Sequence, residues 1–97
     1  MKDKELETMS TEKKFDFICW VNTTSHVLRT QMKSFERKKG NFDIFKQAAI
    51  DSKEVEKQVV KAIKQYKFDL EIEDAVNHLD QLVNETAELI GKYQKEI

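Results

Sequence analysis

The sequence contains no proline, and its 97 residues include only two glycines, Gly40 and Gly91. Both residue types interrupt helices, so their scarcity leaves little in the chain to break long helical segments. Charged residues make up 36% of the chain. Straight-chain residues that favour helices, such as lysine, glutamate, glutamine and leucine, are plentiful. The composition therefore predicts an all-α protein.

Cysteine occurs once, as Cys19, which excludes a disulfide within the chain and suits a reducing compartment. No run of about 18 apolar residues occurs, so we expect no membrane span. Residues 1–14 mix both signs of charge without an apolar core, so we expect no secretory signal. These absences favour a cytoplasmic protein. Residues 1–9 show no apolar period, and we expect them to form a disordered or frayed lead.

Three stretches carry apolar or small residues at alternating spacings of 3 and 4, which is the pattern of a helix buried along one side. They predict helices at about 10–39, 42–67 and 69–95. The three repeats are Ile18, Val21, Ser25, Leu28, Met32 and Phe35; Phe45, Ala48, Ser52, Val55, Val59, Ala62 and Tyr66; and Ile72, Ala75, Leu79, Leu82, Thr86, Leu89 and Tyr93.

Polar residues and one glycine mark the expected helix ends. Gly40 follows three cations and suits a left-handed cap at the end of the first helix. Residues 51–54 resemble a capping box and could start a new helix, but the unbroken repeat favours one continuous second helix. The side chains expected to cap the helix starts are Ser10 or Thr11 for the first helix, Asn41 or Asp43 for the second and Asp69 for the third.

Short connections make consecutive helices antiparallel neighbours. The sequence thus predicts a single domain over residues 10–97, an antiparallel up-down-up three-helix bundle with coiled-coil-like heptad packing. A long hairpin that pairs with a second copy could satisfy similar spacings. In the bundle the repeats align as the layers Phe35/Phe45/Tyr93, Met32/Ala48/Leu89, Leu28/Ser52/Thr86, Ser25/Val55/Leu82, Val21/Val59/Leu79 and Ile18/Ala62/Ala75. The last layer holds two alanines and leaves space for Phe15, Phe17 or Trp20.

Local motifs for catalysis and for metal binding are missing from the sequence. No glycine-rich turn is present to form an oxyanion hole or a phosphate-binding loop. Cys19, His26 and His78 are too few for a zinc or di-iron site, which needs several converging ligands. We expect no catalytic residue, no metal and no cofactor.

The start of the first helix holds more apolar surface than one seam can bury. Residues 15–21 place aromatic and aliphatic side chains around nearly the whole helix. They either fill the core or form a contact surface for another protein or a second copy, which would be a homodimer. We predict a non-catalytic protein-interaction module whose contact residues are Phe15, Phe17, Trp20, Thr24 and Val27. Size and composition would suit a bacterial or phage accessory factor, such as an inhibitor, an immunity protein or a secretion helper.

Nucleic-acid binding is the alternative prediction. Residues 31–67 carry ten basic and five acidic side chains, whereas residues 68–97 carry two basic and eight acidic ones. A row of lysines on the second helix could neutralise phosphates, and a solvated face balanced by the acids of the third helix would explain the same row. The basic residues are Arg37, Lys38, Lys39, Lys53, Lys57, Lys61 and Lys64.

Overall fold

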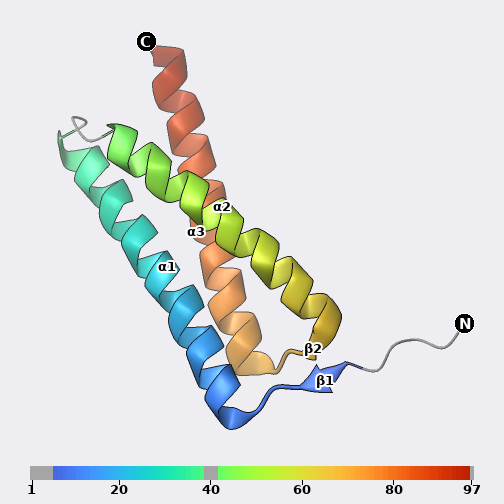
Figure 1. The fold of residues 1–97 in the computed structure, drawn as a ribbon. Helices are drawn as coiled ribbons and strands as arrows, with labels where there is room; N and C mark the ends of the chain where they lie inside the picture. The colour runs from blue at the N-terminus through green and yellow to red at the C-terminus, as the bar shows by residue number, and fades with distance from the viewer. Residues whose placement is uncertain (1–5, 39–41, 97) are drawn as a thin grey trace, which may run out of the picture.

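The computed structural model describes residues 6–38 and 42–96, which form three long helices and two very short strands (Figure 1). α1 and α3 run in one direction and α2 runs in the opposite direction, and each helix packs against the other two. This arrangement confirms the all-α three-helix bundle, while its coiled-coil-like packing stays a prediction. The elements are β1 (Glu7–Thr8), α1 (Thr11–Lys38), α2 (Phe42–Gln65), β2 (Tyr66–Lys67) and α3 (Leu70–Glu96).

The helix starts follow from their capping residues. The Ser10 hydroxyl oxygen accepts a hydrogen bond of 3.2 Å from the amide three residues later, and the Asp69 carboxylate accepts one of 3.0 Å from the amide of Ile72. Each cap satisfies an amide that has no partner within its helix. The predicted caps at Gly40 and Asn41 lie outside the described residues.

Helix α2 continues without a break through Ser52. The Ser52 hydroxyl donates a hydrogen bond of 2.8 Å to the carbonyl oxygen of Ala48, one turn earlier. The Ser52 hydroxyl thus bonds to the backbone inside a helix and does not cap a helix start. The capping-box sequence at residues 51–54 therefore begins no new helix.

Residues 6–9 differ from the disordered lead that the sequence predicts. Glu7 pairs with Tyr66 and Thr8 with Lys67 in a parallel two-stranded ladder, and Met9 is only 8% exposed. Tyr66 and Lys67 consequently leave the helix that was predicted to reach residue 67. Residues 1–5 lie outside the described residues.

Two lysines at the start of α1 contact β2 and the start of α3. The Lys14 ammonium lies 2.5 Å from the Asp69 carboxylate and 3.5 Å from that of Glu71. The hydrogen bond to Asp69 raises the pKa of Lys14, and the same bond is the main cause of a lowered pKa at Asp69. Lys13 donates a hydrogen bond to the Tyr66 hydroxyl and sits 4.3 Å from the centre of its ring.

The core follows the three predicted repeats, since all their members are buried or half-buried. At the end where α1 and α2 connect, the Phe35 ring stacks on Phe45 at 5.1 Å and meets Tyr93 edge-on at 5.0 Å. The polar members of the repeats are satisfied locally. Ser25, for example, donates a hydrogen bond of 3.1 Å to the carbonyl of Val21, so the hydroxyl can be buried without a large cost.

At the opposite end, aromatic rings occupy the layer that holds two alanines. Phe17 packs against the core, and its ring lies 5.6 Å from that of Phe68, which comes from the connection before α3. Phe17 is one of the three residues that the sequence offered for this space. Phe68 was not among them.

Candidate protein-binding groove

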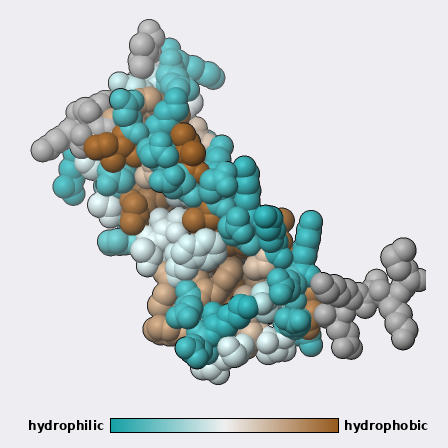
Figure 2. Space-filling model, in the orientation of Figure 1, coloured by the Kyte–Doolittle hydropathy of each residue, from teal (hydrophilic) through white to brown (hydrophobic). Residues whose placement is uncertain are grey.

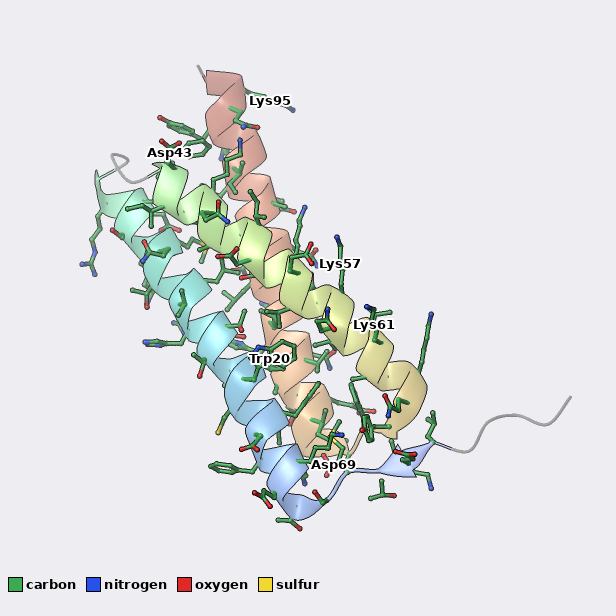
Figure 3. The ribbon with its side chains drawn as sticks, in the orientation of Figure 1. Trp20, Asp43, Lys57, Lys61, Asp69 and Lys95 are labelled. Atoms are coloured by element: carbon green, nitrogen blue, oxygen red, sulfur yellow. The ribbon has the colours of Figure 1, made fainter. Side chains whose placement is uncertain are left out.

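A groove of about 460 Å³ lies between α1 and α2. Its volume falls within the range of about 300–1,000 Å³ that is usual for binding pockets. The apolar parts of its walls come from Trp20, Thr24 and Val27 of α1 and from Ile44, Ala48 and Val55 of α2. In Figure 3 Trp20 extends from α1 into the space between the two helices. Apolar patches lie among polar ones where α1 and α2 meet (Figure 2).

Small side chains and the course of the helices together open this groove. Helices α1 and α2 diverge from the end where they connect toward the end that holds β1 and β2 (Figure 1). Ala48 and Ser52 face the widening gap with little volume. Thr24 stays close to its own helix, because its hydroxyl donates a hydrogen bond of 2.9 Å to the carbonyl of Trp20. The small floor residues leave the space between the larger side chains of the two walls open.

The groove exposes large apolar side chains to water. Trp20 is 39% exposed, Val27 48% and Ile44 56%. Single exposed apolar residues are common on protein surfaces, but three that line one groove form the kind of contiguous patch that marks interaction sites. Tryptophan is also among the residues that contribute most to protein interfaces.

The charge of the groove is confined to one carboxylate. Among the described residues that line it, Asp51 is the one with a formal charge. Its Oδ1 accepts a hydrogen bond of 3.0 Å from the Gln47 amide, which fixes the carboxylate at the α2 rim. A ligand for this groove should therefore combine apolar groups with a positive charge.

The structure divides the predicted contact residues into two sets. Trp20, Thr24 and Val27 line the groove, whereas Phe15 and Phe17 do not. Phe15 is 66% exposed at the start of α1. Phe17 is half-buried and contacts Trp20 edge-on at 5.8 Å, so it supports the tryptophan from the core side.

Sequence reasoning missed the α2 wall of the groove. Ala48 and Val55 belong to the buried repeat and were assigned entirely to the core. Ile44 lies off that repeat, so the repeat predicts no role for it. An aliphatic residue beside a repeat that contains alanine and serine is the one available signal, because small core residues leave room beside them.

The predicted basic residues do not gather into one patch. Lys53, Lys57, Lys61 and Lys64 are all exposed along α2, and Figure 3 shows Lys57 and Lys61 on the side of α2 away from α1. Arg37 is exposed near the end of α1, beside the start of α2, whereas the lysine row extends toward the other end of that helix. The side chain of Lys38 and all of Lys39 lie outside the described residues.

Two carboxyl groups meet between α2 and α3. The half-buried Glu56 shares a hydrogen bond with Asp80, and burial together with this neighbour raises the pKa of Glu56 to about 7. Lys53 acts in the opposite direction but only partly offsets the shift. The pair lies outside the groove between α1 and α2, and it makes the contact between α2 and α3 sensitive to pH.

Other kinds of site gain no support within the described residues. No group of three or more histidine, cysteine, aspartate or glutamate side chains is placed to hold a metal ion there, and Cys19 is exposed. None of the helices in the described part is long and apolar enough to cross a membrane. A comparison of the chain with protein-family models, curated proteins and solved structures finds no match.

Proposed function

We propose that this protein binds another protein by taking an amphipathic helix of that partner into the groove between α1 and α2. The observation that carries the proposal is the line of exposed apolar side chains, Trp20, Val27 and Ile44, over a floor of small residues. The stretch from Ile44 to Val55 spans about 16 Å at 1.5 Å per helical residue, which accommodates about three turns of a docked helix. Grooves between helices commonly bind helices in this way.

Charge narrows the chemistry of the partner. Asp51 at the rim favours a lysine or arginine beside the apolar anchors of the docked helix, because an opposite charge on the partner offsets the desolvation of the carboxylate. We therefore propose a partner helix with aliphatic anchors at i, i+3 or i+4 and i+7, flanked by a basic residue.

The role that we propose is non-catalytic, and its setting is the cytoplasm. An exposed single thiol suits a reducing compartment. The small size of the chain is in keeping with an accessory factor that modifies a larger protein, such as an inhibitor, an immunity protein or a secretion helper.

Site-specific crosslinking in the native host tests the proposal. A photoreactive amino acid in place of Val27 should give one discrete adduct, and the crosslinked peptide should belong to an amphipathic helix with a basic flank. The same amino acid in place of Phe15, an exposed aromatic outside the groove, is the matched control. Ile44→Lys should abolish the Val27 adduct. An adduct from Phe15 alone, or one that survives Ile44→Lys, would refute the proposal.

Nucleic-acid binding stays a prediction that takes second place. The lysines of α2 are exposed as it requires. However, Ile50 and Val60 are interleaved with them, and the row holds neither arginine nor an aromatic residue for base stacking. A gel-shift titration with salt tests it: binding that falls steeply with salt, and is lost in Lys57→Glu/Lys61→Glu, would support this class.

A further inference from the structure

A second groove, of about 250 Å³, lies between α2 and α3. It shares no lining residue with the groove between α1 and α2. Its apolar floor includes Ile50 of α2 together with Val83, Ala87 and Ile90 of α3. Farther along α2, Val60 and Ile63 are each about half exposed. An apolar strip therefore follows the junction of the two helices on the side away from α1.

The α2 edge of this strip is basic. Lys46, Lys53, Lys57, Lys61 and Lys64 recur at spacings of 7, 4, 4 and 3, which places them on one side of the helix. All five are exposed, and within the described part of the chain none forms an ion pair with α3. Lys57 forms an ion pair of 3.0 Å with Glu54 of its own helix. The acids of α3 thus do not balance this row by direct contact.

The α3 edge of the strip is acidic. Glu73, Asn77, Asp80 and Asn84 recur at spacings of 4, 3 and 4 and are all exposed, and the contact of Asp80 with Glu56 places this row beside α2. Two carboxylates and two amides therefore lie across the apolar strip from the lysine row. Such a surface has a basic edge, an apolar middle and an acidic edge. It is complementary to itself when the second copy is related to the first by a two-fold axis parallel to the strip, because the basic edge of each copy then lies on the acidic edge of the other.

The levels of the two rows agree with such a pairing. Glu56 shares a hydrogen bond with Asp80, and Ile50 and Ala87 line one groove, so positions whose numbers add to about 137 lie at the same height. A two-fold axis parallel to the helices preserves height. It therefore brings Lys64 level with Glu73 of the second copy, and Lys57 level with Asp80 of the second copy.

We propose that two copies of this chain associate through the strip between α2 and α3, with the lysine row of each copy on the acidic row of the other. A second copy is favoured over a nucleic acid because the acidic row would repel phosphates. It is favoured over an unrelated acidic protein because it supplies both rows at matching heights. The dimer leaves the groove between α1 and α2 uncovered, so the two proposals are independent.

The contact area suggests a weak and reversible dimer. The 24 residues of α2 span about 36 Å, and two helices side by side are about 18 Å wide. The face therefore offers about 650 Å² per copy, somewhat below the ~800 Å² of a standard interface. We expect dissociation in the micromolar range and weaker association at high salt, because exposed charge pairs are screened.

Sedimentation velocity with charge-reversal variants of the full chain tests the proposal. Lys64→Glu and Glu73→Lys should each weaken self-association at least tenfold, since each variant places like charges against each other twice. An equimolar mixture of the two variants should dimerise again, because every pair between unlike copies has regained opposite charges. Lys33→Glu and Glu36→Lys, at exposed positions of α1, are the matched controls. Circular dichroism checks that each variant is helical.

Several results would overturn the proposal. One is a chain that stays monomeric at a concentration of several hundred micromolar. Another is a dimer that neither variant weakens, which would place the contact elsewhere. A mixture that remains monomeric would show that Lys64 and Glu73 do not face each other between copies. Finally, the wild-type chain could bind a single-stranded or duplex oligonucleotide of 20 nucleotides while the Lys64→Glu variant does not. That result would show that the lysine row binds nucleic acid.

Discussion

The carboxyl pair between α2 and α3 should make the stability of the fold depend on pH near neutrality. Glu56 has its pKa raised from 4.5 to about 7 by burial and by Asp80. Between these two values the folded protein holds a proton that the unfolded chain releases. Linkage then requires the free energy of unfolding to fall as pH rises. The stabilisation is fully present below about pH 4.5 and is lost as pH rises through about 7.

The size of the effect follows from the shift and from the exposure of the side chain. A shift from 4.5 to about 7 would correspond to about 3.5 kcal/mol for a fully buried group, at about 1.4 kcal/mol per pH unit. Glu56 is only half-buried, and water screens its interaction with Asp80. We therefore expect a change of about 1 kcal/mol in the free energy of unfolding.

Glu56→Gln isolates this contribution. Glutamine carries no charge at any pH and can still donate a hydrogen bond to Asp80. The variant should match the wild type at pH 4, below the unfolded pKa of Glu56, and exceed its unfolding free energy by about 1 kcal/mol at pH 8. Urea titrations followed by circular dichroism at the two pH values measure the difference. Glu36→Gln, at an exposed position of α1, is the control for loss of a charge. A Glu56→Gln variant that gains the same stability at both pH values would refute the reasoning.

Three further predictions concern the ends of the helices and the aromatic start of α1. Phe17→Ala should lower the free energy of unfolding by about 2 kcal/mol, because it removes a half-buried ring, whereas Phe15→Ala should change it by less than about 0.5 kcal/mol; equal urea midpoints would contradict the division of these residues. Asp69→Ala should lower the melting temperature more than Asp69→Asn does, because asparagine can still cap α3; identical melting curves would show that the cap is unimportant. Met9→Asp should expose the N-terminal strand to limited proteolysis, since the buried methionine anchors it; unchanged cleavage would contradict its placement.

The core could be predicted from the sequence because helical periodicity is a local signal. Each member of the repeats lies on the same side of its helix whatever the partner is, so Phe35, Phe45 and Tyr93 could be placed in one layer before any contact was known. The caps at Ser10 and Asp69 were accessible for the same reason, since a cap acts within one turn.

The remaining features depend on geometry that no local pattern carries. The pairing of Glu7 with Tyr66 joins segments 59 positions apart, and two-residue strands have no period to detect. The groove depends on how far α1 and α2 diverge, which the sequence does not encode locally. The repeat therefore predicts Ala48 as a core residue, although it also borders the groove. The sequence does not distinguish which of Phe17 and Trp20 is buried. In the structure the ring of Phe68 packs against Phe17, which is half-buried, and Trp20 stays more exposed.

The tryptophan offers the most direct test of the proposed groove. Trp20 is the one tryptophan of the chain and lines the groove, so its fluorescence reports on that surface alone. Titration with a synthetic peptide of the crosslinked partner helix should shift its emission to shorter wavelengths, because the docked helix removes water from the ring. Val27→Lys should abolish the shift. A peptide that binds the chain while the emission of Trp20 stays unchanged would contradict a groove between α1 and α2.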